Sequence, residues 1–136
     1  MMALVTRILF WGYVLMLLVV GASGVFIAEW ELSRIFAVRL DDMDKLARAT
    51  ILNQYRFLKS IEFAFGLFLI SCRWEIFRVP KYNRIFLIGL FGGVAARLLA
   101  IVLDGMPHWA FLMFLALELA TGVLVLIQSK KTLTAS

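Results

Sequence analysis

The stretch Gly89–Glu118, GLFGGVAARLLAIVLDGMPHWAFLMFLALE, contains the features that decide how this chain folds. Two apolar runs are joined by a Gly-Met-Pro turn, and each run is long enough to cross a bilayer at about 1.5 Å per residue. Arg97 lies inside the first run and Glu118 inside the second. A charge within the hydrocarbon is costly unless it is paired. We therefore expect these two side chains to form a buried pair between consecutive helices.

The composition of the whole chain is that of a membrane protein. Of its 136 residues, 63% are hydrophobic, and the mean hydropathy of +0.94 exceeds that expected of a soluble domain. The formal net charge of +5 would suggest nucleic acid as the partner of a soluble protein. Here the basic residues fall mostly at the ends of apolar runs, as the positive-inside bias and anionic headgroups favour. We expect membrane lipids as partners and no nucleic acid.

The apolar runs predict one all-α domain over residues 1–136, an integral membrane four-helix bundle. The predicted spans cover about residues 4–28, 55–77, 85–103 and 109–128. A secretory signal is the alternative for the first run, because Arg7 precedes the apolar part and small residues follow it. The apolar part is longer than the usual signal core, which favours a retained span.

The polar segment between the first two spans predicts two local features. Residues 31–40 carry apolar side chains at helical spacing, which is typical of a short amphipathic helix on the membrane surface. Asp41 and Asp42 follow as expected N-caps of the next helix, with Asp44 in its first turn. A cation site is the alternative use of these carboxylates, but the glycine and distal glutamate of a calcium loop are missing.

Loop charges predict the orientation. The second loop is flanked by basic residues, the last span is followed by two lysines, and the third loop has no Lys or Arg. This distribution places both termini in the cytoplasm. The first loop also carries basic residues and argues partly against that assignment. The basic residues concerned are Arg73, Arg78, Lys81, Arg84, Lys130 and Lys131 for the cytoplasmic side, and Arg34, Arg39, Lys45 and Arg48 in the first loop.

Three ionisable groups lie at similar depths in three predicted spans. Glu62, Arg97 and Glu118 are roughly 9 to 13 Å inside the outer boundary. Arg97 also continues the face of Gly89 and Gly93, so it should point at a helix that these glycines contact. We expect Arg97 to bridge both carboxylates as a structural clamp. The alternative is a proton or ion relay, for which the inner half of the membrane offers almost no polar groups.

Residues next to this cluster could line an opening toward the outside. Asp104, Gly105, Pro107 and His108 lie at the predicted mouth of the cluster. The single histidine excludes a bis-histidine haem within one chain and leaves no His/Cys cluster for zinc. Ser60, Ser71 and the single Cys72 have no evident base nearby. We predict no catalytic residues, no metal site and no cofactor.

Three segments carry a resemblance to a known family. They are NQYRFLKSIE (53–62), GVAARLLAIVLDGMP (93–107) and LELATG (117–122). In these segments the chain resembles the domain of unknown function 4345 family, small bacterial membrane proteins with four predicted helices. The resemblance implies the bundle and a bacterial inner-membrane location. It points at Arg97, Asp104, Gly105, Pro107 and Glu118, and it implies no activity.

Two functions are compatible with these features. The first is a non-catalytic accessory or assembly subunit of a larger membrane complex, whose partners would be other integral membrane subunits. The small size and the lack of cofactor motifs favour it. The second is a small lipid- or quinone-binding carrier or enzyme that uses the outward-facing Glu-Arg-Glu cluster. An enzyme is the less expected of the two.

Overall fold

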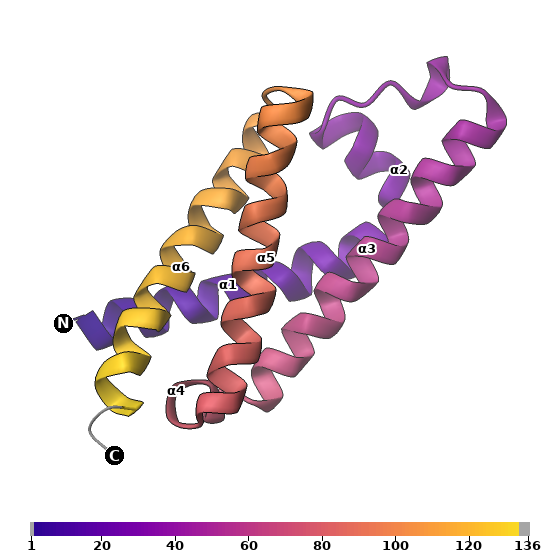
Figure 1. Ribbon diagram of the computed structural model, residues 1–136. Helices are drawn as coiled ribbons and strands as arrows, with labels where there is room; N and C mark the ends of the chain where they lie inside the picture. Colours follow the sequence, from indigo (N-terminus) through magenta and orange to yellow (C-terminus); the bar gives the residue numbers. More distant parts are fainter. Residues whose placement is uncertain (1, 134–136) are drawn as a thin grey trace. The chain divides into compact units, whose positions relative to one another are not determined.

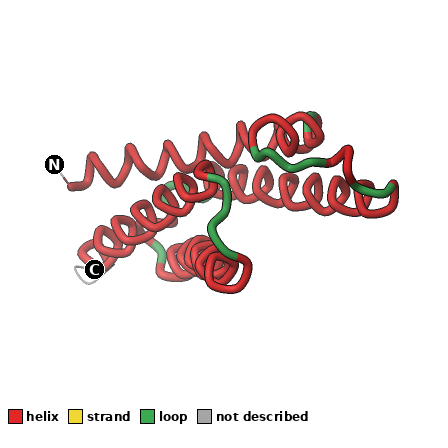
Figure 2. The backbone as a smooth tube through the Cα atoms, turned by 90° about the horizontal axis from the view of Figure 1, so that it is seen from above, coloured by secondary structure: helices red, strands yellow, loops and turns green. Residues whose placement is uncertain are grey.

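The computed structural model describes residues 2–133, and the regular structure in this range is entirely helical (Figure 1, Figure 2). The expected all-α class is thus confirmed for the described residues. The long helices are α1 (Met2–Phe26), α3 (Lys45–Ser71), α5 (Pro80–Asp104) and α6 (Trp109–Leu133). The short ones are α2 (Ala28–Trp30), the π-helical turn η1 (Glu31–Ile35), the 3-10 turn η2 (Leu40–Asp42) and α4 (Glu75–Arg78).

Three of the long helices have the length and composition of membrane spans. These are Ala3–Phe26, Pro80–Asp104 and Trp109–Lys131, and they indicate a membrane protein. The helix α3 is also long, and it runs without a break from the polar segment toward the predicted second span. It is not among the three because Arg56, Lys59 and Glu62 interrupt its apolar stretch. The prediction of four spans therefore stays a prediction.

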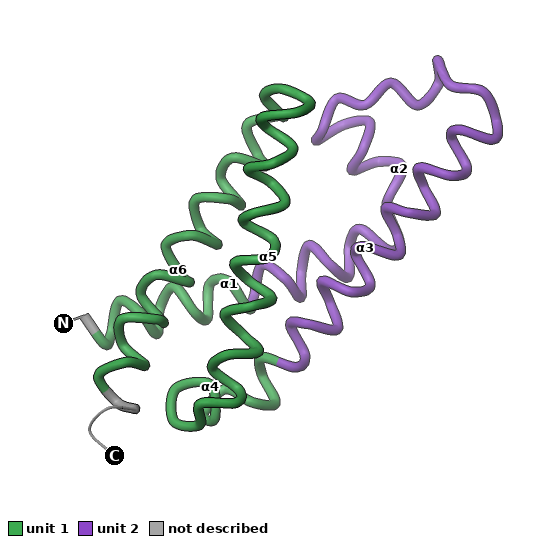
Figure 3. Tube along the Cα trace, viewed as in Figure 1, with its two compact units in different colours: residues 1–14, 69–136 green, residues 15–68 purple. Residues whose placement is uncertain are grey.

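The chain divides into two compact units (Figure 3). Unit 1 contains residues 1–14 and 69–136, and unit 2 contains residues 15–68. The helix α1 begins in unit 1 and ends in unit 2, whereas α3 begins in unit 2 and ends in unit 1. The expectation of one domain over the whole chain is not decided by this division.

Unit 1 is built on the helical hairpin of α5 and α6, with α4 packed against both. Gly122 of α6 allows a close approach, because an added Cβ would come within 2.5 Å of the Leu90 side chain. Asn83 is buried on α5 and donates a hydrogen bond of 2.9 Å to the carbonyl of Ile76 on α4. Buried side chains such as Val125 complete this core.

The ends of α5 follow from two residue types. Pro80 is the first helical residue, and Val79 before it is extended, as proline requires of its predecessor. Gly105 ends the helix with φ of 94° and donates its backbone N–H to Ile101 O at 3.2 Å. A side chain rarely adopts this conformation, so Gly105 makes the turn into α6 possible.

Unit 2 pairs the second half of α1 with α3. Gly21 lies against the backbone of Phe63, and Gly66 lies against Leu17 and Leu18. Residue numbers rise along one helix as they fall along the other, so the two helices run antiparallel. Glycine lets their backbones come close, as is typical of helices in lipid.

We predicted that the face of α5 that carries Gly89 and Gly93 contacts another helix, and in the structure it does not. Gly89 is exposed, and a Cβ added to Gly92 or Gly93 would meet nothing within 4 Å. The expectation that Gly93 and Arg97 share a helix contact is therefore wrong within the described chain. The buried face of α5 is instead formed by larger side chains, including Leu90 and Val94, which directly follow Gly89 and Gly93 in the sequence.

The segment between α1 and α3 differs from the predicted helix over residues 31–40. A break at Ile27 separates α2 from α1, and the π-helical turn brings Glu31 and Leu32 into the interior. Ala37, with φ of 56°, follows the end of this helical stretch. The amphipathic pattern is retained, because Phe36 is also buried while its neighbours on the sequence are exposed.

The N-cap of α3 is Asp44, not Asp41 or Asp42. Its carboxylate accepts hydrogen bonds of 2.9 Å from the backbone N–H groups of Leu46 and Ala47. The predicted caps fall too early because the 3-10 turn Leu40–Asp42 and an extended Met43 come between. Within residues 2–133, no group of three or more His, Cys, Asp or Glu side chains is arranged to hold a metal ion.

Candidate functional site

Arg97 and Glu118 form a two-pronged ion pair between α5 and α6. Arg97 donates from Nε to Glu118 Oε2 at 2.9 Å and from Nη2 to Oε1 at 3.1 Å. The side chain of Glu118 is 8% exposed and that of Arg97 is 27% exposed. This geometry uses both carboxylate oxygens and holds the two helices in one register.

Aromatic and apolar groups surround the ion pair. The guanidinium carbon of Arg97 lies 5.8 Å from the ring centre of Phe111 and 5.9 Å from that of Phe114. A small cavity of about 180 Å³ adjoins Arg97. Its walls are otherwise apolar and come from both helices of the hairpin: Ala100, Ile101, Pro107, Phe111, Leu112 and Leu115. Apolar surroundings strengthen the attraction between Arg97 and Glu118 and make it costly to separate the two charges.

The four residues predicted at the mouth of the cluster lie in or beside the α5–α6 turn. Pro107 lines the small apolar cavity, and Asp104 is the exposed last residue of α5. His108 accepts from the N–H of Ala110 through Nδ1 at 3.4 Å, at the start of α6. In these positions Gly105 and His108 have evident structural tasks, namely the turn itself and a helix cap.

Glu62 has its own partner in unit 2. Its Oε2 accepts from Lys59 Nζ at 2.7 Å, one helical turn earlier on α3. Lys59 is 4% exposed, so this pair is largely withdrawn from solvent. The structure therefore joins Arg97 to Glu118 in unit 1 and Glu62 to Lys59 in unit 2. A bridge from Arg97 to Glu62 stays a prediction.

A second buried carboxylate was not foreseen from the sequence. Glu31 is 4% exposed and accepts from the Ser23 hydroxyl at 2.5 Å and the Tyr55 hydroxyl at 2.7 Å. Lys59 lies over the Tyr55 ring, 5.3 Å from its centre. We name the five residues Ser23, Glu31, Tyr55, Lys59 and Glu62 the unit 2 polar network.

The sequence signals part of this network. Lys59 and Glu62 are three apart, a spacing that places them on one helix face. The sequence does not signal the burial of Glu31, which stands in a charged Glu-Trp-Glu triplet at the end of an apolar run. Its inward position depends on the π-helical turn that begins at this residue.

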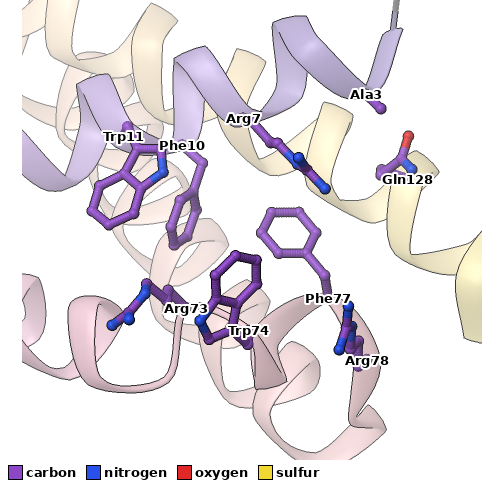
Figure 4. A pocket seen from close by; sticks show the side chains of 9 residues that line it. All are labelled: Ala3, Arg7, Phe10, Trp11, Arg73, Trp74, Phe77, Arg78 and Gln128. Atoms are coloured by element: carbon purple, nitrogen blue, oxygen red, sulfur yellow. The ribbon is translucent and has the colours of Figure 1, made fainter.

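A basic cavity of about 310 Å³ lies in unit 1 (Figure 4). We name it the arginine pocket. Three arginines, Arg7, Arg73 and Arg78, contribute to its walls. The remaining walls are Ala3, Phe10, Trp11, Trp74, Phe77 and Gln128. The sequence indicates Arg73 and Arg78 only as loop charges and Arg7 only as a charge near the start of the first apolar run. Residues so far apart in the chain meet only when α1, α4 and α6 pack together.

Comparison with known proteins gives one family. No curated protein and no solved structure matches the chain. A family model described as a domain of unknown function, DUF4345, matches residues 5–128, which is nearly the whole chain. The matched range includes the Arg97–Glu118 pair, the unit 2 polar network and most of the arginine pocket. By this match the chain belongs to the DUF4345 family of domains of unknown function.

Proposed function

We propose that this chain is a non-catalytic accessory or assembly subunit of a larger complex in the bacterial inner membrane. The observation that carries the proposal is the bare apolar face of α5. Only 17% of the most apolar stretch of this helix is buried by the rest of the chain. Gly92 and Gly93 lie on the open side, and small residues allow the backbone of another membrane helix to come close.

The charged groups within the apolar helices support the same proposal. Arg97 is bound by Glu118 and Lys59 by Glu62, so these four charges are committed to partners in their own units. Charges that are paired in this way stabilise helix packing. A carrier or an enzyme would need such groups to be available to a substrate.

We further propose a four-span topology with both termini in the cytoplasm. In unit 1 the arginine pocket brings together Arg7 near the start of α1, Arg73 and Arg78 after α3, and Gln128 near the end of α6. These three chain segments would then face the same side, and the positive-inside bias favours the cytoplasm. The proposal makes α3 the returning span, with its Lys59 and Glu62 charges paired.

Purification in mild detergent followed by native mass measurement tests the subunit proposal. We expect the chain to migrate with larger membrane proteins. A double variant, Gly92→Leu with Gly93→Leu, should release it from them without changing its own melting temperature, because a Cβ added at either position meets nothing within 4 Å in the chain. Gly12→Leu is the matched control, since Gly12 also has open space around it on α1. A monodisperse lone protein in all three preparations would overturn the proposal.

A lipid- or quinone-binding carrier is the second candidate. The observation in its favour is the apolar cavity of about 180 Å³ beside Arg97, since pockets for apolar ligands combine such walls with a few polar groups. Leu112→Trp should fill this cavity and remove any quinone that co-purifies with the chain. A quinone retained equally by Leu112→Trp and by the unchanged protein would place that ligand elsewhere.

A further inference from the structure

The arginine pocket brings three positive charges together with no acidic side chain among its lining residues. Within residues 2–133, Arg7 and Arg78 have neither an ion pair nor a hydrogen bond to a side chain or carbonyl. Arg73 donates to the carbonyl of Ile70 at 3.0 Å and lies 5.6 Å from the Trp74 ring centre. Like charges that line one cavity repel each other, and an anion bound in the cavity lowers this repulsion.

The acidic residue nearest to Arg73 and Arg78 in the sequence does not neutralise the arginines of the pocket. Glu75 follows Trp74, but it is not among the residues that line the cavity. One of its carboxylate oxygens is buried without a hydrogen-bond partner in the described structure. The cationic walls of the pocket are therefore not neutralised from within the cavity.

The other walls of the pocket are aromatic. Figure 4 shows Phe10, Trp74 and Phe77 between Arg73 on one side and Arg7 with Arg78 on the other, and Trp11 lies on the side of Arg73. Phe10 and Phe77 meet edge to face with ring centres 5.4 Å apart. Tryptophan and arginine at the ends of apolar helices are typical of the level at which lipid headgroups lie.

We propose that the arginine pocket binds the phosphate group of a phosphate ester, supplied either by an anionic phospholipid headgroup or by a soluble phosphate compound. Arginine matches phosphate because its planar guanidinium donates two parallel hydrogen bonds to two phosphate oxygens. The cavity of about 310 Å³ is within the size range of small-molecule pockets. The aromatic walls accommodate the glycerol and upper acyl carbons of a lipid.

The experiment measures melting of the full chain in neutral detergent while one probe is added. The probes are phosphatidylglycerol, phosphatidylcholine, glycerol 3-phosphate and inorganic phosphate. A ligand that binds only the folded state raises the melting temperature. We expect phosphatidylglycerol to raise it in a saturable way and phosphatidylcholine to have a much smaller effect.

The double variant Arg7→Gln with Arg78→Gln tests whether the pocket is responsible. It should weaken binding of the effective probe by on the order of tenfold or more, since each charge-assisted contact contributes strongly. Its charge-matched control is Lys81→Gln with Arg84→Gln, because these exposed residues lie on the first turns of α5 and do not line the pocket. The control should bind within about twofold of the unchanged protein. Helical circular dichroism and melting without a probe establish that both variants fold.

Each result bears on the proposal. A saturable shift with phosphatidylglycerol alone, lost in the pocket variant and kept in the control, identifies a lipid headgroup as the source. The same pattern with glycerol 3-phosphate or inorganic phosphate identifies a soluble phosphate compound. The proposal is overturned if no probe raises the melting temperature, or if the control variant loses as much binding as the pocket variant, since diffuse charge would then explain the effect. Co-migration with larger proteins plays no part in this test, so its failure would not affect the subunit proposal.

Discussion

Arg97 and Glu118 neutralise each other in a place where either charge alone would be costly. Glu118 has no other cation among the ion pairs of the described residues. Removing one partner of a buried pair leaves the other desolvated and uncompensated. The contribution of this pair is therefore measured best by removing the two charges separately and together.

Replacing Arg97 with alanine should lower the free energy of unfolding by about 3 kcal/mol. Arg97→Lys should recover only part of this loss, because an ammonium cannot reproduce the paired bonds from Nε and Nη2. Thermal and denaturant unfolding in detergent measure both values. The double variant Arg97→Leu with Glu118→Leu should be closer to the unchanged protein than Arg97→Ala is. An Arg97→Ala protein as stable as the original would show that the ion pair does not hold the hairpin.

Among the described residues, the hydroxyl groups of Tyr55 and Ser23 donate to the buried carboxylate of Glu31. Tyr55→Phe keeps the ring but removes this donor, so we expect a loss of about 2 kcal/mol in the free energy of unfolding. The matched control is Tyr82→Phe, on α5 in unit 1 and outside the unit 2 polar network. The two variants are compared by the same unfolding measurement. Equal stability of both would mean that Glu31 finds an equivalent donor elsewhere.

At this scale the sequence predicted the ion pair and missed the network. Arg97 and Glu118 could be matched because each is an isolated charge in a long apolar run, and the short turn between the runs makes the helices neighbours. Glu31 stands among other polar residues, so nothing local distinguishes a buried carboxylate from a solvated one. Its burial follows from the backbone turn that starts at the same position.

Among the elements, the antiparallel pair of α1 and α3 depends most on glycine. A Cβ at Gly21 would come within 2.6 Å of the Phe63 backbone nitrogen. A backbone atom cannot move aside as the end of a flexible side chain can. The helices of unit 2 can therefore keep their spacing only if this position has no side chain.

We expect Gly21→Ala to destabilise the protein by about 2 kcal/mol or more, because the two backbones must move apart. Gly12→Ala is the control on the same helix, where an added Cβ meets nothing within 4 Å. That change should be neutral or slightly stabilising, since alanine favours the helix. Melting in one detergent compares the pair. A Gly21→Ala protein that melts with the Gly12→Ala protein would show that the close approach is not needed.

At the scale of the whole molecule, the proposed topology predicts which sites reagents can reach. Cys72 is the single cysteine, and it lies just before Arg73 at the end that we assign to the cytoplasm. Met106 is 74% exposed in the turn between α5 and α6, at the opposite end of those helices.

A membrane-impermeant maleimide applied to intact spheroplasts should leave Cys72 unlabelled until the membrane is opened. The variant Cys72→Ser with Met106→Cys should be labelled from outside without opening it. Mass measurement of the purified protein reports both reactions. Labelling of Cys72 from outside would reverse the proposed orientation. Accessibility of both positions from the same side would contradict a crossing by α5.

The sequence by itself determined that this chain is helical and belongs with membrane proteins, because long apolar runs have few other ways to satisfy their backbone groups in lipid. It also determined that Arg97 pairs with Glu118, because isolated charges in adjoining apolar helices need each other. Only the tertiary structure decided which glycines contact a helix and where Glu31 lies. It also gathered Arg7, Arg73 and Arg78 around one pocket. Those features depend on side chains from distant segments, and helical periodicity in one segment does not specify its neighbours.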